Sequence, residues 1–218
     1  HQKYLAKSNE YKGVKVLTLW AGAPGVMLSH SKPVVSIEDW KGLKVFCGVK
    51  NVCDLASSMG ATPVQRPGPQ VTEMIERKIV DAAFIDPASY KNFRLERFVK
   101  QAMVAPNGFY APTFYLVVNP KAWEALSAKD RSAIEKLSGE VLSRKAGADW
   151  DKDADESRAL MKKNNVTMNE AGGAYLKALE DKLVPERTRS YIADAKTASV
   201  DGDAALKYLR EQIKAAAQ

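Results

Sequence analysis

Short apolar runs alternate with helical patterns in the first half of the chain. Three such runs predict strands, at 44–47, 61–64 and 79–84. The segments between them, 51–59 and 71–75, place apolar residues at helical spacing, and Gly60 follows the first as a stop signal. This β-α-β-α-β alternation predicts a parallel sheet covered by helices, which is an α/β fold.

Further elements flank this central unit. Apolar runs at both sides predict four more strands, at 14–20, 26–29, 99–104 and 113–119. Gly22, Pro24 and Gly25 form a turn between the first two of these strands, and residues 87–98 have the pattern of a helix. The central unit is therefore one part of a larger mixed α/β structure.

The second half of the chain is mainly helical. Apolar residues recur at helical spacing from Ser127 to Met161, which predicts one helix longer than about 25 residues with Gly147 as its weakest point. A helix of this length is typical of an element that braces two lobes. The remaining pattern predicts a short strand and three helices, at 166–168, 172–183, 185–195 and from about 201 onward.

Composition narrows the class of protein. The 218 residues are 45% hydrophobic, enough for a buried core, and no apolar run approaches the roughly 20 residues that span a bilayer. The 33 basic and 26 acidic residues are intermixed without a basic block, which argues against nucleic-acid binding, although a net charge of +7 favours anionic solutes. The chain begins at His1, so we expect any export signal to lie outside these residues.

The chemistry-bearing residues indicate binding and not catalysis. In open α/β sheets ligands bind outside the carboxyl ends of the strands, where Phe46, Cys47 and 84–86 lie here. We find no nucleophile and base pair and no glycine-rich phosphate cradle at these positions. With two histidines in the chain, a zinc site lacks ligands, and we expect neither a metal nor a cofactor.

The two cysteines allow two interpretations. Cys47 and Cys53 are six residues apart across a strand-to-helix turn, so a disulfide can form and would suit an oxidising compartment. Such a short loop gains little stability from closure, and two buried free thiols are the simpler interpretation.

Four sequence blocks resemble one known family. KPVVSIEDWKGLKV, GATPV, QVTEMIERKIVDAA and FYLVVNPKAWEALSAKDRSAIEKL occur in the order and spacing of the solute-binding subunit of TRAP (tripartite ATP-independent periplasmic) transporters. The resemblance implies a two-lobed periplasmic binding protein-like fold, with parallel and mixed sheets and a long helix bracing both lobes. It also implies a periplasmic protein that captures a small organic molecule and delivers it to TRAP-type membrane permease subunits.

The resemblance also implies a division into lobes. Residues 1–25 would be a remnant of the first lobe, and 26–111 the α/β second lobe. Residues 112–151 would return to the first lobe with the long helix, and 152–218 would supply second-lobe and bracing helices. Roughly the N-terminal third of the family pattern is lacking, so we expect self-association or pairing with a separate N-terminal segment.

The family's ligand-binding arginine is replaced here. The family writes Gly-Leu-Lys, one further residue and then an arginine that pairs a carboxylate, whereas this chain has Phe46 at that position. Aromatic and acidic residues near the expected cleft suggest a ligand that is aromatic, amine-bearing or apolar, bound better than dicarboxylates. The candidate ligand-binding residues are Phe46, Phe84, Asp86, Phe109 and Tyr110.

Each candidate has a plainer explanation. An aromatic residue at a strand end is commonly a core residue, and Asp86 before Pro87 is typical of a helix cap. If the ligand carries a carboxylate, Lys50 is the nearest replacement cation, ahead of Lys44 and Arg66.

Two other functions stay open. A receptor on the same fold could report its ligand to a sensor protein without transport. An enzyme that uses the Cys47 thiol would belong to a different class, but it lacks an obvious base.

Overall fold

The computed structural model describes residues 3–4, 8–30, 32–106 and 108–216. A six-stranded sheet has the order β4-β3-β5-β2-β6-β8. Its strands are β2 (Val26–Ser29), β3 (Lys44–Cys47), β4 (Thr62–Gln65), β5 (Ala82–Ile85), β6 (Gln101–Val104) and β8 (Thr167–Glu170). Strand β3 runs parallel to both β4 and β5, as the β-α-β-α-β pattern predicts, whereas β2 is antiparallel to β5 and β6. The α/β prediction is confirmed, and the sheet is mixed.

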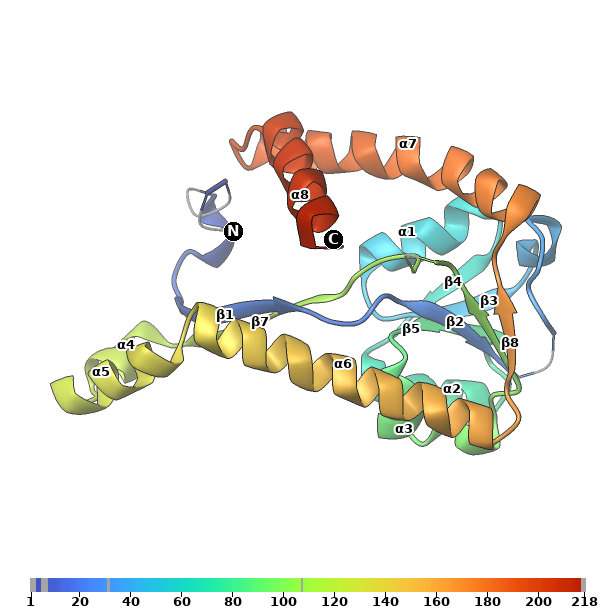
Figure 1. The fold of residues 1–218 in the computed structure, drawn as a ribbon, viewed down its shortest axis with the longest axis horizontal. Helices are drawn as coiled ribbons and strands as arrows, with labels where there is room; N and C mark the ends of the chain where they lie inside the picture. Colours follow the sequence, from blue (N-terminus) through green and yellow to red (C-terminus); the bar gives the residue numbers. More distant parts are fainter. Residues whose placement is uncertain (1–2, 5–7, 31, 107, 217–218) are drawn as a thin grey trace.

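Helices cover both faces of this sheet (Figure 1). Helix α1 (Lys50–Ser58) lies on one face, while α2 (Val71–Glu76) and α3 (Ala88–Asn92) lie on the other. Short 3₁₀ helices complete the connections, η1 (Asn9–Tyr11), η2 (Glu38–Trp40), η3 (Gly68–Gln70) and η4 (Leu95–Arg97). The single helix predicted over 87–98 is wrong, because Arg94 adopts a left-handed conformation (φ 53°) that separates α3 from η4.

Each face of the sheet has its own hydrophobic core. Side chains alternate along a strand, so Val45 and Cys47 of β3 join the core under α1, whereas Phe46 between them joins the core under α2 and α3. Strand β5 divides in the same way, with Phe84 in the first core and Ala83 in the second.

A separate two-stranded sheet extends from the main one. Strands β1 (Lys15–Ala21) and β7 (Thr113–Val118) pair in antiparallel fashion and are followed by α4 (Pro120–Glu124) and α5 (Ala128–Leu137). The segments that join the two sheets are also bonded to each other. Gly22 N–H donates to the Pro112 carbonyl and Gly25 N–H to the Tyr110 carbonyl, both at 2.8 Å.

Helix α6 (Glu140–Lys163) braces the two sheets, as the fold prediction requires (Figure 1). Ser143 Oγ donates to the Leu19 carbonyl of β1 at 2.6 Å, and Ser157 Oγ donates to the Ala88 carbonyl of α3 at 3.3 Å. The prediction of one helix from Ser127 to Met161 is wrong, because the chain breaks at Gly139, which has φ 65° and donates its N–H to Leu17. Gly147, the predicted weak point, lies inside the unbroken helix.

Two helices close the chain. The two helices predicted at 172–183 and 185–195 form one element, α7 (Gly173–Thr197), with Pro185 inside it. Helix α7 packs over α1, places Leu179 and Leu183 in the core on that face, and continues through Pro185. Helix α8 (Gly202–Ala216) follows and turns back toward β1 and β7 (Figure 1).

Candidate functional site

A cavity of about 790 Å³ lies between the loop before β7, the start of α1 and the two C-terminal helices. Most of its lining side chains are apolar or aromatic. They include Val49, Val52, Phe109, Tyr110, Phe114, Leu176, Leu179, Leu183, Val184, Tyr191 and Leu206. This volume is within the range of small-molecule sites, and the lining suits an organic solute with an apolar body.

Two glycines shape the loop that forms one wall. A Cβ atom at Gly25 would lie 2.2 Å from the Tyr110 ring, so only glycine lets this ring pack against the crossing strand. Gly108 has φ 69°, and a Cβ atom there would lie 2.3 Å from Pro24. The aromatic pair Phe109 and Tyr110 is thereby held at the cavity.

A cluster of buried aromatic side chains packs behind Phe109 and Tyr110, on the side away from the cavity. The Phe84 ring lies 5.4 Å from Phe109 and 6.3 Å from Tyr110, both edge-on. Trp40 packs on Phe84 at 5.3 Å, and its indole N–H donates to the Tyr175 hydroxyl of α7 at 2.9 Å. Phe84 itself is buried, so it supports the lining residues and does not face the cavity.

Burial affects the tyrosines of this region. Burial raises the pKa of Tyr110 far above its ordinary value, and the nearby Asp86 carboxylate raises it further. Burial likewise raises the pKa of Tyr175 to about 12. Both hydroxyls therefore stay protonated at neutral pH and can act as donors.

Asp86 lies beside this cluster at the end of β5. Its Oδ2 accepts a hydrogen bond from Ser89 Oγ at 2.8 Å, whereas its side chain makes no capping bond to the backbone amides of α3. Its Oδ1 is buried and has no partner among the described residues. The structure thus brings four of the predicted residues together, Phe84, Asp86, Phe109 and Tyr110.

Phe46 is separated from these four. Its side chain is 1% exposed and lies in the core beneath α2 and α3, on the face of the sheet opposite Phe84. It does not line the cavity. The alternation of side chains along β3 gives Phe46 this position, so a stacking contact with a ligand is inconsistent with the structure.

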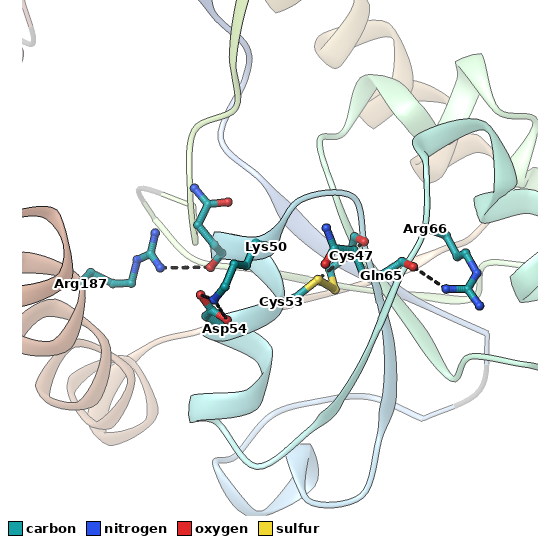
Figure 2. Close-up of a disulfide and its surroundings, with 8 residues drawn as sticks. Cys47, Lys50, Cys53, Asp54, Gln65, Arg66 and Arg187 are labelled. Atoms are coloured by element: carbon teal, nitrogen blue, oxygen red, sulfur yellow. Dashed lines mark hydrogen bonds and ion pairs between the residues drawn. A yellow bond between two sulfur atoms is a disulfide. The ribbon is translucent and has the colours of Figure 1, made fainter. Parts of the chain in front are cut away.

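The cation expected to replace the family's arginine is also elsewhere. Lys50 pairs with Asp54 at 2.7 Å and is 81% exposed, and the Arg66 guanidinium donates to the Gln65 carbonyl (Figure 2). Neither lines the cavity; of the described basic residues, Arg187 and Arg210 do. Sequence reasoning missed both because their place at the cavity depends on how α7 and α8 pack, which no local pattern reveals.

Cys47 and Cys53 form a disulfide, with their Cα atoms 5.4 Å apart (Figure 2). The interpretation as free thiols is wrong, because α1 starts directly after β3 and turns both side chains into the same core. The Cys47 thiolate that an enzyme would need is therefore tied up. The part of the chain that the structure describes contains no group of three or more residues able to hold a metal ion.

No helix among the described residues is long and apolar enough to cross a bilayer. A mixed sheet is joined through two crossing strands and a long helix to a second sheet, and an aromatic cavity lies beside the crossing. This architecture is that of a two-lobed solute-binding protein.

The comparisons with known proteins agree with this class. Residues 1–194 match the model of the bacterial extracellular solute-binding protein family 7, and the chain belongs to that family. Its members are TRAP transporter receptors that act outside the cytoplasm, bind small molecules and work with membrane permease components.

Individual relatives support the assignment. The chain is 32% identical over 218 residues to the outer membrane transporter protein TsaT of Comamonas testosteroni. This alignment covers 99% of this chain and 63% of TsaT. A TRAP periplasmic solute-binding protein from Bordetella bronchiseptica, solved with (R)- and (S)-mandelate, is 31% identical with a TM-score of 0.92. That match covers 98% of this chain and 67% of the other.

A more distant structure shares the fold. A TRAP solute-binding protein from Rhodoferax ferrireducens, solved with benzoate, is 21% identical with a TM-score of 0.84 and covers 92% of this chain. The chain spans 63% of TsaT, 67% of the Bordetella bronchiseptica protein and 63% of the Rhodoferax ferrireducens protein.

Proposed function

We propose that this chain is the solute-binding part of a TRAP transporter and that its ligand is an aromatic monocarboxylic acid. The observation that carries the proposal is the cavity itself. Phe109 and Tyr110 form one wall, apolar side chains of α7 form another, and two arginines supply positive charge. An aromatic ring and a single carboxylate match this combination, because rings stack edge-on with Phe and Tyr and carboxylates pair with guanidinium groups.

Two further observations support this ligand class. The relative from Bordetella bronchiseptica binds mandelate, an aromatic acid, and is 31% identical to this chain. In addition, Phe46 stands where the family pattern has an arginine, so one cation that could pair with a second carboxylate is replaced by an apolar residue.

Isothermal titration calorimetry tests the proposal. Benzoate and mandelate should bind the 218-residue chain at least about 10-fold more tightly than succinate, which corresponds to roughly 1.4 kcal/mol. Micromolar binding of succinate, together with weak binding of benzoate, would contradict the proposed ligand. Delivery to a permease is tested separately, by loss of aromatic-acid uptake when the gene is deleted and by co-purification with permease subunits.

The division into lobes at 25, 111 and 151 remains part of this proposal. Two bonded segments, 22–25 and 109–112, connect the two sheets, and the second of them contains Tyr110. A change in the angle between the sheets would therefore move the aromatic wall, which is how a two-lobed receptor closes on its solute. Pairing of this chain with a further N-terminal segment, or with a second copy, likewise remains a proposal.

A further inference from the structure

We infer that Arg187 of α7 is the residue that recognises the ligand carboxylate, in place of the arginine that the family has at position 46. This inference rests on the proposed function and names the specificity residue of the same cavity. Arg187 lies on α7, whereas Phe46 lies on β3 and points to the face of the sheet opposite the cavity.

The position of Arg187 supports this role. It lines the cavity and is half-buried, and one of its terminal nitrogens donates to the Asn51 carbonyl at the start of α1 at 3.0 Å (Figure 2). This bond holds the guanidinium beside the cavity before a ligand arrives, so little side-chain freedom remains to be lost on binding. A guanidinium has five N–H donors, and the remaining ones can donate to the oxygens of a carboxylate.

The charge of Arg187 is not compensated by another described residue. No carboxylate lies within ion-pair distance of its guanidinium in the described part of the chain, whereas Lys50 nearby is paired with Asp54. Glu180 also lines the cavity, but it lies seven residues earlier on α7, roughly 10 Å along the helix axis. A ligand carboxylate would therefore be the first anion to pair with Arg187.

Arg210 is the other basic residue at the cavity, and it is less suited to this role. It is exposed on α8 and makes no hydrogen bond or ion pair with the described residues. An exposed cation is screened by salt and must be ordered on binding, which leaves a small net gain. Arg210 contributes a general positive field, whereas Arg187 gives direct pairing.

Titration of Arg187 variants with benzoate and with neutral benzamide tests the inference. Arg187→Ala should weaken benzoate binding about 10- to 100-fold, as expected for charge-assisted hydrogen bonds, and change benzamide binding less than about 3-fold. Arg187→Lys should recover part of the benzoate affinity, because it keeps the charge but loses the planar fork. The matched control is Arg189→Ala, which removes an exposed arginine outside the cavity on the same helix and should leave both affinities unchanged.

Three results would overturn the inference. The first is unchanged benzoate affinity in Arg187→Ala, and the second is an equal loss of benzoate and benzamide, which would indicate a structural role. The third is a loss of benzoate binding in Arg210→Ala that Arg187→Ala does not show. If the parent chain binds benzoate and one of these three results is obtained, the inference fails and the proposed function stands. If the parent chain binds no aromatic acid, both fail.

Discussion

The two faces of the six-stranded sheet use aromatic residues in opposite ways. Beneath α2 and α3, Phe46 belongs to a core that also holds Val71, Met74 and Tyr90, and it is sealed from solvent. Beneath α1 and α7, Phe84 is equally buried, but its neighbours Phe109 and Tyr110 continue from the core to the wall of a cavity. One face is a closed core, and the other is a core that opens into a site.

This difference shows how a family position can lose its role. Substituting phenylalanine for arginine at position 46 removes a cation, but it does not add a ring to the site, because the side chain points into the closed core. The aromatic character of the site comes from a loop far away in the sequence. Its positive charge comes from the C-terminal helices.

The largest expected effect is on stability, from Phe46→Ala. Removing a fully buried ring should lower the free energy of unfolding by about 3–5 kcal/mol, while the benzoate affinity of the folded protein stays unchanged. Urea denaturation followed by titration measures both quantities, and Phe46→Leu, which nearly conserves volume, is the control. A loss of benzoate affinity without a loss of stability would show that position 46 does belong to the site.

The next effect concerns the disulfide, which joins β3 to α1 under the open face. Replacing both Cys47 and Cys53 with alanine should lower stability by about 2 kcal/mol, as expected for a short closed loop. It should also weaken benzoate binding, because Asn51, whose carbonyl accepts the hydrogen bond from Arg187, lies within the loop that the disulfide closes. Dithiothreitol should reproduce both effects in the parent chain and change nothing in the alanine variant. Benzoate affinity that survives both treatments would argue against this coupling.

A smaller effect should separate two partly buried phenylalanines. Phe109→Ala should weaken aromatic-acid binding by about 0.5–1.5 kcal/mol, because it removes the ring of the cavity wall that an aromatic ligand would contact edge-on. Phe93→Ala on the closed face should leave affinity unchanged. Calorimetry on this matched pair compares the two faces directly. Equal affinities for the two variants would contradict the claim that only the face with Phe109 opens into the ligand site.

The smallest effect is a pH dependence of stability. Because burial raises the pKa of Tyr175 to about 12, the folded protein keeps this hydroxyl protonated where the unfolded chain, with a pKa of about 10, ionises. Its contribution is therefore fully present below pH 10 and is lost as pH rises from about 10 to 12. Thermal melts across this range should show a smaller alkaline loss for Tyr175→Phe than for the parent chain. An identical loss would assign the effect to other groups, Tyr110 among them.

The alternation of apolar runs was enough to predict the parallel core β4-β3-β5, because strand and helix periods differ over a few residues. Helix ends were harder to place. Gly139, at the break, donates a hydrogen bond to Leu17, and α7, which continues through Pro185, packs over α1. Both are long-range contacts that a local pattern does not contain.

The site residues divide in the same way, into those that a local sequence pattern predicts and those that depend on long-range packing. Asp86, Phe109 and Tyr110 could be placed near the cleft because they lie in or beside loops at strand ends. Phe46 could not, since its orientation depends on which face of β3 it occupies, and Arg187 could not, since α7 reaches the cavity only in the folded chain. Side chains alternate between the two faces of a strand, and counting the alternating positions along β3 would have indicated that Phe46 lies on the face opposite Val45 and Cys47.

A crystal structure with 4-bromobenzoate tests the central claim most directly. The anomalous scattering of bromine locates the ring, and the density locates the carboxylate. We expect a bromine peak between Phe109, Tyr110 and the apolar side of α7, with the carboxylate on Arg187. A bromobenzoate molecule bound elsewhere, or one in the cavity with its carboxylate away from Arg187, would contradict it.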